Sequence, residues 1–89
     1  MSDGEHPIAV LCDTHVIPIL MFLDGSGPSR KTDIYAAVGR NSNMPLKLER
    51  MAEAGLVDIS PMGNSEVVGL TELGSAVSAK LREIDGLMA

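Results

Sequence analysis

Two histidines and the single cysteine, all near the start of the chain, are the side chains with the clearest potential for metal chemistry. His6, Cys12 and His15 are the only soft metal ligands, and Asp13 stands beside them. Cys12 and His15 are three residues apart, so on a helix they would share a face. A structural zinc site takes four ligands in recognisable pairs, and this chain lacks the second pair. We therefore expect no metal site; the simpler interpretation is a buried thiol beside a surface imidazole.

Residues that build an enzyme's active site are also missing at the required spacing. Cys12 has no asparagine or aspartate partner at an informative distance along the chain, and no Gly-x-Ser-x-Gly turn occurs. The segment Gly25–Lys31, GSGPSRK, lacks the Gly-Lys-Ser/Thr ending of a phosphate-binding loop. No paired carboxylates flank a recognisable pocket. We predict that the protein is not an enzyme and requires no cofactor.

Basic side chains gather in one part of an otherwise acidic chain. The formal net charge is −5, yet five of the seven lysines and arginines lie between Ser29 and Gly55. These five are Arg30, Lys31, Arg40, Lys47 and Arg50. A mildly basic segment on an acidic body would orient weakly toward a polyanion. Helices commonly carry mixed charges, so a solvated surface would explain the same pattern.

This basic segment has the pattern of two short helices joined by a polar turn. The first covers about 30–38 and ends at Gly39, which can take a positive φ without a Cβ clash. The second covers about 43–54, with Pro45 in its first turn, where a missing N–H costs nothing. Its apolar residues recur at i, i+4 and i+7 and predict one buried stripe: Met44, Leu48 and Met51. The pair indicates a helix-turn-helix or a small αα-hairpin.

A β-hairpin pattern and a last helix follow the second helix. Two short β-rich runs, Leu56–Ile59 and Glu66–Leu70, flank a breaker run of Ser, Pro, Gly and Asn at 60–65. Thr71 would cap a last helix whose apolar edge consists of Leu73, Val77, Leu81 and Ile84. We expect that helix to break at Asp85-Gly86. The order helix, helix, hairpin, helix is that of a winged helix, an α+β and mostly helical fold.

The same residues resemble a known family. LERMAEAGLVDI and VVGLTELG are similar to the L-x-x-L-x-x-x-G-L-V … Y-x-L-T-x-x-G pattern of bacterial and archaeal winged-helix regulators of the MarR and HxlR kind, and IPILMFLDGSGPSRKTDI resembles the opening of the HxlR kind. The resemblance covers about Val16 to Leu81. It implies three to four helices plus a two-stranded wing, with a very short first strand in the loop at 24–28. It also implies that the helix at about 43–54 lies in the major groove of double-stranded DNA.

The outward face of that helix supplies the candidate DNA contacts. With the apolar stripe turned inward, steps of about 100° place Asn43, Leu46, Lys47 and Arg50 on one outward stripe. Asn and Arg suit bidentate contacts to base edges, and Lys suits phosphate. The turn and the first helix complete the predicted DNA-binding set, with Arg30, Lys31, Arg40, Asn41 and Ser42. The resemblance therefore implies a sequence-specific transcriptional regulator.

Two features favour an alternative, a winged-helix protein-interaction module. Leu46 could touch a thymine methyl, but an exposed leucine also suits a protein-binding face. The wing tip at 61–64 carries no Arg or Lys, which puts insertion of the wing into a minor groove in doubt. A protein partner would use the outward face of the second helix or the last helix.

The remaining predictions concern domain limits and assembly. Eighty-nine residues make one small domain, at 8–85, between a flexible segment at 1–7 and a frayed end at 86–89. Thr14 could cap the first helix, Val16–Leu23. The apolar run Ile8–Leu11 and the last helix, where Gly74 permits close approach, favour a homodimer; the same helix face could instead close the monomer's core. One cysteine and no membrane-spanning apolar run suggest a cytoplasmic protein without disulfide or membrane contact.

Overall fold

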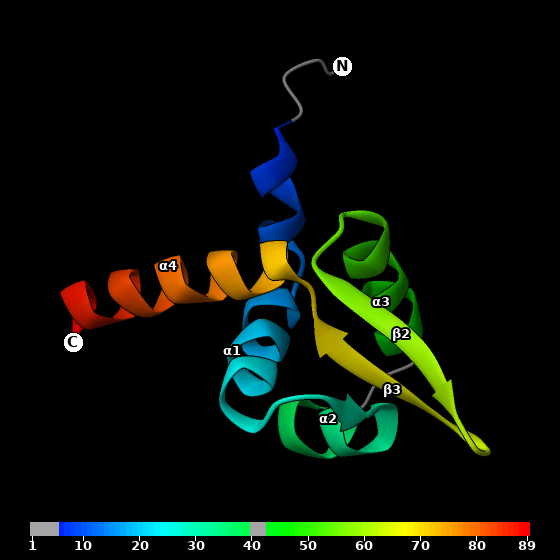
Figure 1. Ribbon diagram of the computed structural model, residues 1–89. Coiled ribbons are helices and arrows are strands. Elements are labelled where there is room, and N and C mark those ends of the chain that lie inside the picture. Colours follow the sequence, from blue (N-terminus) through cyan, green and yellow to red (C-terminus); the bar gives the residue numbers. More distant parts are fainter. Residues whose placement is uncertain (1–5, 40–42) are drawn as a thin grey trace.

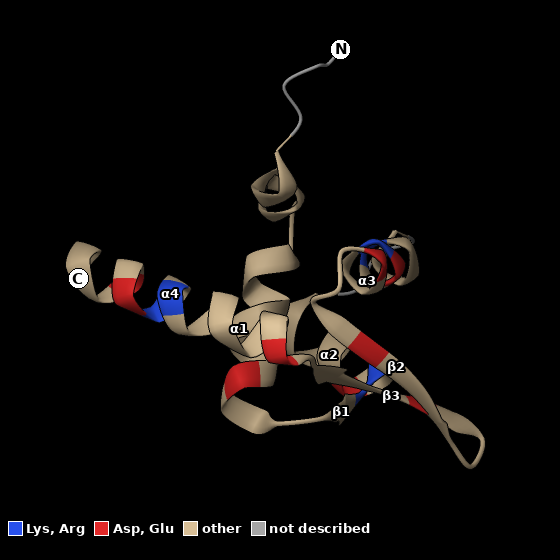
Figure 2. Cartoon of the chain, turned by 45° about the horizontal axis from the view of Figure 1, so that its top comes forward, with Lys and Arg blue, Asp and Glu red and all other residues tan. Residues whose placement is uncertain are grey.

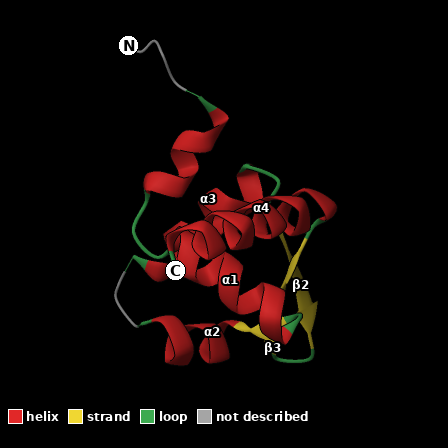
Figure 3. Cartoon of the chain, turned by 90° about the vertical axis from the view of Figure 1, so that its left-hand side faces the viewer, coloured by secondary structure: helices red, strands yellow, loops and turns green. Residues whose placement is uncertain are grey.

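The computed structural model describes residues 6–39 and 43–89, and within them five helices and three strands form a winged helix (Figure 1). In chain order the elements are the 3₁₀ helix η1 (Pro7–Cys12), α1 (Val16–Ser26), β1 (Ser29–Arg30), α2 (Lys31–Val38), α3 (Met44–Glu53), β2 (Val57–Met62), β3 (Ser65–Leu70) and α4 (Glu72–Met88). Figure 3 shows the strands gathered on one side of the molecule and the helices on the other. The predicted fold class is confirmed.

Helices α2 and α3 form the predicted helix-turn-helix. Gly39, at φ 146°, follows the end of α2, and Pro45 stands in the first turn of α3. The predicted stripe of α3 is buried, because Met44, Leu48 and Met51 are all 0% exposed. The rotation of α3 about its own axis is thereby fixed, and with it the side that can face a ligand.

The hairpin is longer than the sequence predicted. Strands β2 and β3 pair antiparallel from Val57 opposite Leu70 to Met62 opposite Ser65, so most of the predicted breaker run belongs to the strands. Pro61 is tolerated because β2 is an edge strand of a sheet ordered β1-β3-β2. Strand β1 is the very short first strand that the family resemblance implied; it pairs with β3 directly after the predicted loop.

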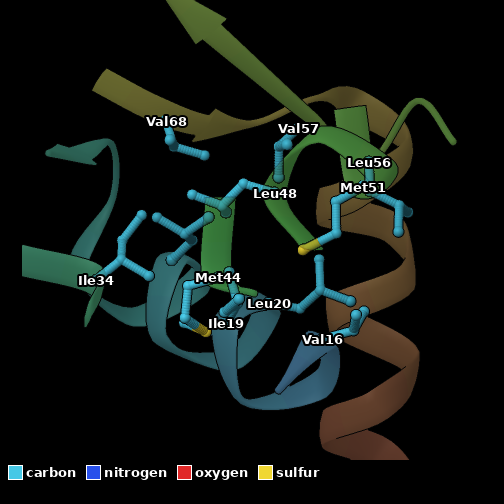
Figure 4. Packing of buried hydrophobic residues seen from close by; sticks show 11 residues of the cluster. Val16, Ile19, Leu20, Ile34, Met44, Leu48, Met51, Leu56, Val57 and Val68 are labelled. Carbon is cyan, nitrogen blue, oxygen red and sulfur yellow. The ribbon is translucent and has the colours of Figure 1, made fainter. Parts of the chain in front are cut away.

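The core lies where α1, α2, α3 and the sheet meet (Figure 4). Its buried apolar residues are Val16, Ile19, Leu20, Leu23, Ile34, Met44, Leu48, Met51, Leu56, Val57 and Val68. All are aliphatic or methionine, as expected for a chain in which only Phe22 and Tyr35 are aromatic. Removing this area from water is the main favourable term in folding. Because α3 contributes three of these residues, the core holds it in place.

The first and last α-helices, α1 and α4, differ from prediction in their caps or ends. His15, at φ 79°, occupies the residue before α1, so Thr14 is not its cap, and α1 continues through Asp24 to Ser26. Helix α4 continues through Gly86 to Met88, so the predicted break at Asp85-Gly86 is wrong. A glycine lowers helix stability by about 1 kcal/mol but, unlike proline, does not obstruct the helix. No helix within the described residues has both the length and the apolar character needed to cross a membrane.

The start of α4 is fixed by a cap, as predicted. The Thr71 hydroxyl accepts a hydrogen bond from the Gly74 backbone N–H at 3.0 Å. Gly74 itself is buried against the Leu56 carbonyl of the same chain. The close approach that we expected Gly74 to offer a partner is therefore made within the monomer.

Candidate nucleic-acid interface

Helix α3 presents a polar outer face opposite its buried stripe. Pro45, Leu46, Glu49 and Arg50 are exposed on it, as is Asn43 at the residue before the helix. Leu46, the apolar side chain of this face, is 46% exposed. The face therefore combines hydrogen-bonding groups with one apolar group, the mixture that a base edge or a protein surface could use.

Lys47 does not lie on this outer face, and here the predicted outward stripe was wrong. Its side chain is only 11% exposed, and its ammonium lies 2.8 Å from a carboxylate oxygen of Asp13. The reason is visible on the helical wheel: Lys47 is three residues after Met44 and four before Met51, so it flanks the buried stripe. Its aliphatic stem packs there while the charge reaches Asp13.

Asp13 also accepts a hydrogen bond from Arg50, with Nη1 at 3.0 Å from Oδ2. The hydrogen bond from Lys47 and, to a smaller extent, the one from Arg50 hold the pKa of the Asp13 carboxyl below its usual range. Two cations of α3 thus share one carboxylate from the junction of η1 and α1. No sequence signal pointed to Asp13 in this role, because the partners are 34 and 37 residues away.

The predicted DNA-binding residues before α3 differ in their surroundings. Arg30 is exposed at the start of α2. Lys31 is drawn toward the sheet by Glu66 of β3, with Nζ 2.6 Å from Oε1. Arg40, Asn41 and Ser42 lie outside the described residues. Figure 2 accordingly shows acidic and basic segments side by side on α3 rather than one basic surface.

The candidate metal ligands do not converge. Cys12 is exposed, so the expected buried thiol was wrong. The imidazole of His15 is half-buried with its Nδ1 unpaired among the described residues, close to Gly39 at the end of α2. Within residues 6–39 and 43–89, no three His, Cys, Asp or Glu side chains are grouped to hold a metal ion.

An apolar groove of about 500 Å³ separates η1 from α4. Its lining consists of Pro7, Ile8, Val10, Leu11, Ala54, Leu56, Leu73, Val77, Lys80, Leu81 and Ile84. The predicted apolar edge of the last helix forms one wall, and the run Ile8–Leu11 contributes to the other. Val77 and Leu81 of this edge pack against the monomer's core, whereas Leu73 and Ile84 are at least half exposed, as is Ile8 on η1.

The chain is similar to solved winged-helix structures, although no protein-family model and no curated protein sequence matches it. A protein from Archaeoglobus fulgidus superposes with a TM-score of 0.78 at 22% identity, over 93% of this chain and 97% of that one. A predicted DNA-binding transcriptional regulator from E. coli gives 0.74 at 22%, over 86% and 83%. A homodimeric winged helix-turn-helix DNA-binding domain from Mycobacterium bovis, a possible ArsR-family regulator, gives 0.74 at 18%, over 97% and 91%. These similarities establish the fold.

Proposed function

We propose that this winged-helix chain is a DNA-binding transcriptional regulator, not an enzyme, that reads DNA with α3. The observation that carries the proposal is the orientation of α3, whose apolar stripe is buried while Asn43, Leu46 and Arg50 are exposed. In a helix-turn-helix the second helix enters the major groove. Among the similar structures, the E. coli and M. bovis proteins are described as DNA-binding.

The proposed contacts differ in what they recognise. Asn43 and Arg50 suit the edges of adenine and guanine, and Leu46 suits a thymine methyl group. Arg30, exposed before α2, suits a phosphate, whereas Lys31 would first have to leave Glu66. Arg40, Asn41 and Ser42 are included because they directly precede Asn43 and the proposed recognition helix in sequence. Whether this chain belongs with the MarR or HxlR kind of regulator stays a prediction.

The acidic body shapes this function. With a net charge of −5, the chain gains little from general attraction to the phosphate backbone. Contacts to particular bases would therefore carry more of the binding than in a basic regulator. A regulator of this kind would act in the cytoplasm.

We further propose that the chain is a homodimer that pairs through the groove between η1 and α4. The half-exposed Ile8, Leu73 and Ile84 are apolar side chains that a second copy would cover. A single small domain reads few bases, and a two-fold pair would read two half-sites about 10 bp apart. The M. bovis domain, similar over 97% of this chain, is homodimeric.

One alternative is supported by specific contacts. Lys31 and Lys47 are both held by carboxylates, and the wing carries no Lys or Arg, which leaves few cations for DNA. A protein-interaction module would show this pattern and would use Leu46 or the exposed side of α4 instead. Fold alone does not decide between these functions.

Titration of the pure protein with duplex DNA at about 50 mM and about 150 mM salt separates the two. We expect binding that weakens with salt and NMR shifts centred on Asn43, Arg50 and Arg30. Absence of binding to any genomic duplex at the lower salt, together with loss of a protein partner in Leu46→Asp, would establish the interaction module instead.

A further inference from the structure

The junction between η1 and α1 holds two cations of α3, although it is distant from them in sequence. We propose that Asp13 is a positioning residue that sets the DNA specificity of α3, by keeping Lys47 away from the phosphate backbone and by orienting Arg50. This inference rests on the proposed function. It adds a residue outside the helix-turn-helix to the determinants of binding.

Lys47 is withheld by both packing and charge. Its ammonium is 2.8 Å from Oδ1 of Asp13, and its side chain is 11% exposed. To reach a phosphate, the ammonium would have to leave the carboxylate and the stem would have to leave its place between Met44 and Met51. A lysine held in this way releases no counterion from DNA and adds nothing to the salt dependence of binding.

Arg50 is oriented but stays accessible. Its side chain is 54% exposed, and the contact with Oδ2 of Asp13 is made by Nη1 at 3.0 Å. A guanidinium has five N–H donors in a rigid fork, so it can hold Asp13 and a guanine edge at once. Restricting an arginine before it binds lowers the entropy lost on binding, which favours the one base that fits the restricted geometry.

The backbone of Asp13 is held by the ends of the two neighbouring helices. The Asp13 N–H donates to the Val10 carbonyl at 3.3 Å, and the Asp13 carbonyl accepts from the Val16 N–H at 3.2 Å. These bonds tie the residue to the end of η1 and the start of α1. The ion pairs therefore link α3 to a residue whose backbone is tied to both η1 and α1.

The test compares Asp13→Asn with Asp24→Asn in the full chain. Asp24 is a matched control because it also pairs with an arginine, Arg82, but between α1 and α4. Each protein is titrated over a salt series with a duplex selected by the wild type from a randomised pool, and with a random duplex of equal length. Urea unfolding checks that both variants fold.

We expect Asp13→Asn to bind the random duplex more tightly, with a salt slope steeper by about 0.9, the value for one additional phosphate contact. Its preference for the selected duplex should fall roughly tenfold, because Arg50 is no longer restricted. Asp24→Asn, with the same change of charge, should keep the wild-type slope and preference. If Asp13→Asn behaves like Asp24→Asn, the ion pairs are only structural and the inference is wrong.

Lys47→Met by itself provides a second test that does not require Asp13→Asn to fold, and the double variant adds a check where Asp13→Asn folds. Methionine keeps an unbranched apolar stem, so alone it should leave the salt slope unchanged, and combined with Asp13→Asn it should remove the added slope. A slope flatter by about 0.9 in Lys47→Met alone would place Lys47 on a phosphate and overturn the inference. In each of these failures the wild type still binds duplex; a wild type that binds none overturns the proposed function, and this inference with it.

Discussion

Gly74 at the start of α4 and Leu56 at the start of the hairpin are packed backbone to backbone. A Cβ placed on Gly74 would stand 2.0 Å from the Leu56 carbonyl oxygen. That same oxygen accepts a hydrogen bond from the Thr71 N–H at 3.1 Å. The contact fixes where α4 leaves the sheet, and with it the wall of the apolar groove.

Gly74→Ala should therefore destabilise the fold, by about 1–3 kcal/mol, because the two backbones must separate. Gly86→Ala is the matched control on the same helix, where a Cβ would meet nothing within 4 Å. It should stabilise the helix by up to about 1 kcal/mol. Urea unfolding of both variants measures the difference, and equal midpoints would contradict the close packing at Gly74.

Leu48→Ala should cost about 2–5 kcal/mol, because Leu48 is fully buried at the centre of the core. In a domain of this size that approaches the whole stability. Leu46, two residues earlier on the same helix, is 46% exposed. Leu46→Ala removes the same atoms as Leu48→Ala and should cost far less stability. Thermal melting of the pair tests the rotation of α3; a greater loss in Leu46→Ala would mean that the helix is turned the other way.

The ion pairs of Asp13 should make stability depend on pH at the acid end. Its pKa is lowered in the folded protein from an ordinary value of 3.8, so the folded state favours the charged carboxylate. That contribution is complete above the ordinary pKa and is lost as the pH falls through the lower, folded-state pKa. Urea unfolding should show wild type more stable than Asp13→Asn at neutral pH, with the gap closing below about pH 4. A gap that is constant down to about pH 2 would contradict the lowered pKa.

Dimer formation should depend on the groove between η1 and α4. The wild type should sediment at tens of micromolar as about twice the 9.4 kDa chain mass. Leu73→Asp and Ile8→Asp should yield monomers, because each places a charge in the apolar interface. Leu87→Asp is the control, on the same helix but 85% exposed and outside the groove lining. A wild type that sediments only as the monomer would refute the proposed assembly.

The proposed base contacts should be sensitive to sequence. Arg50→Ala and Asn43→Ala should each lose roughly 1–3 kcal/mol on a selected duplex and little on a random one. Glu53→Lys should strengthen binding to both duplexes if the end of α3 approaches phosphate. Arg82→Ala, which removes an arginine from α4, is the control and should weaken binding to neither duplex. Equal losses of binding on selected and random duplexes would mean that Arg50 and Asn43 contact the DNA phosphate backbone and not the bases.

The order of elements was readable from the sequence because the signals that define it are local. The spacing of Met44, Leu48 and Met51 set the buried side of α3, and Thr71 marked the start of α4. Each signal involves residues within two helical turns, so a window of the sequence contains it whole. The resemblance added the short strand β1, which its own two residues could not indicate.

What the side chains of α3 have available for a ligand was decided only by the tertiary structure. Lys47 and Lys31 were both predicted to contact DNA, and both are held by carboxylates from other parts of the chain, Asp13 and Glu66. The extent of the hairpin likewise depended on the pairing of β2 with β3. The packing of Gly74 on the Leu56 carbonyl, 18 residues earlier in the chain, was also decided only by the fold. Helical periodicity predicts which way a side chain points, but not which charged side chain it will pair with. That partner is distant in sequence and comes close only when the chain has folded.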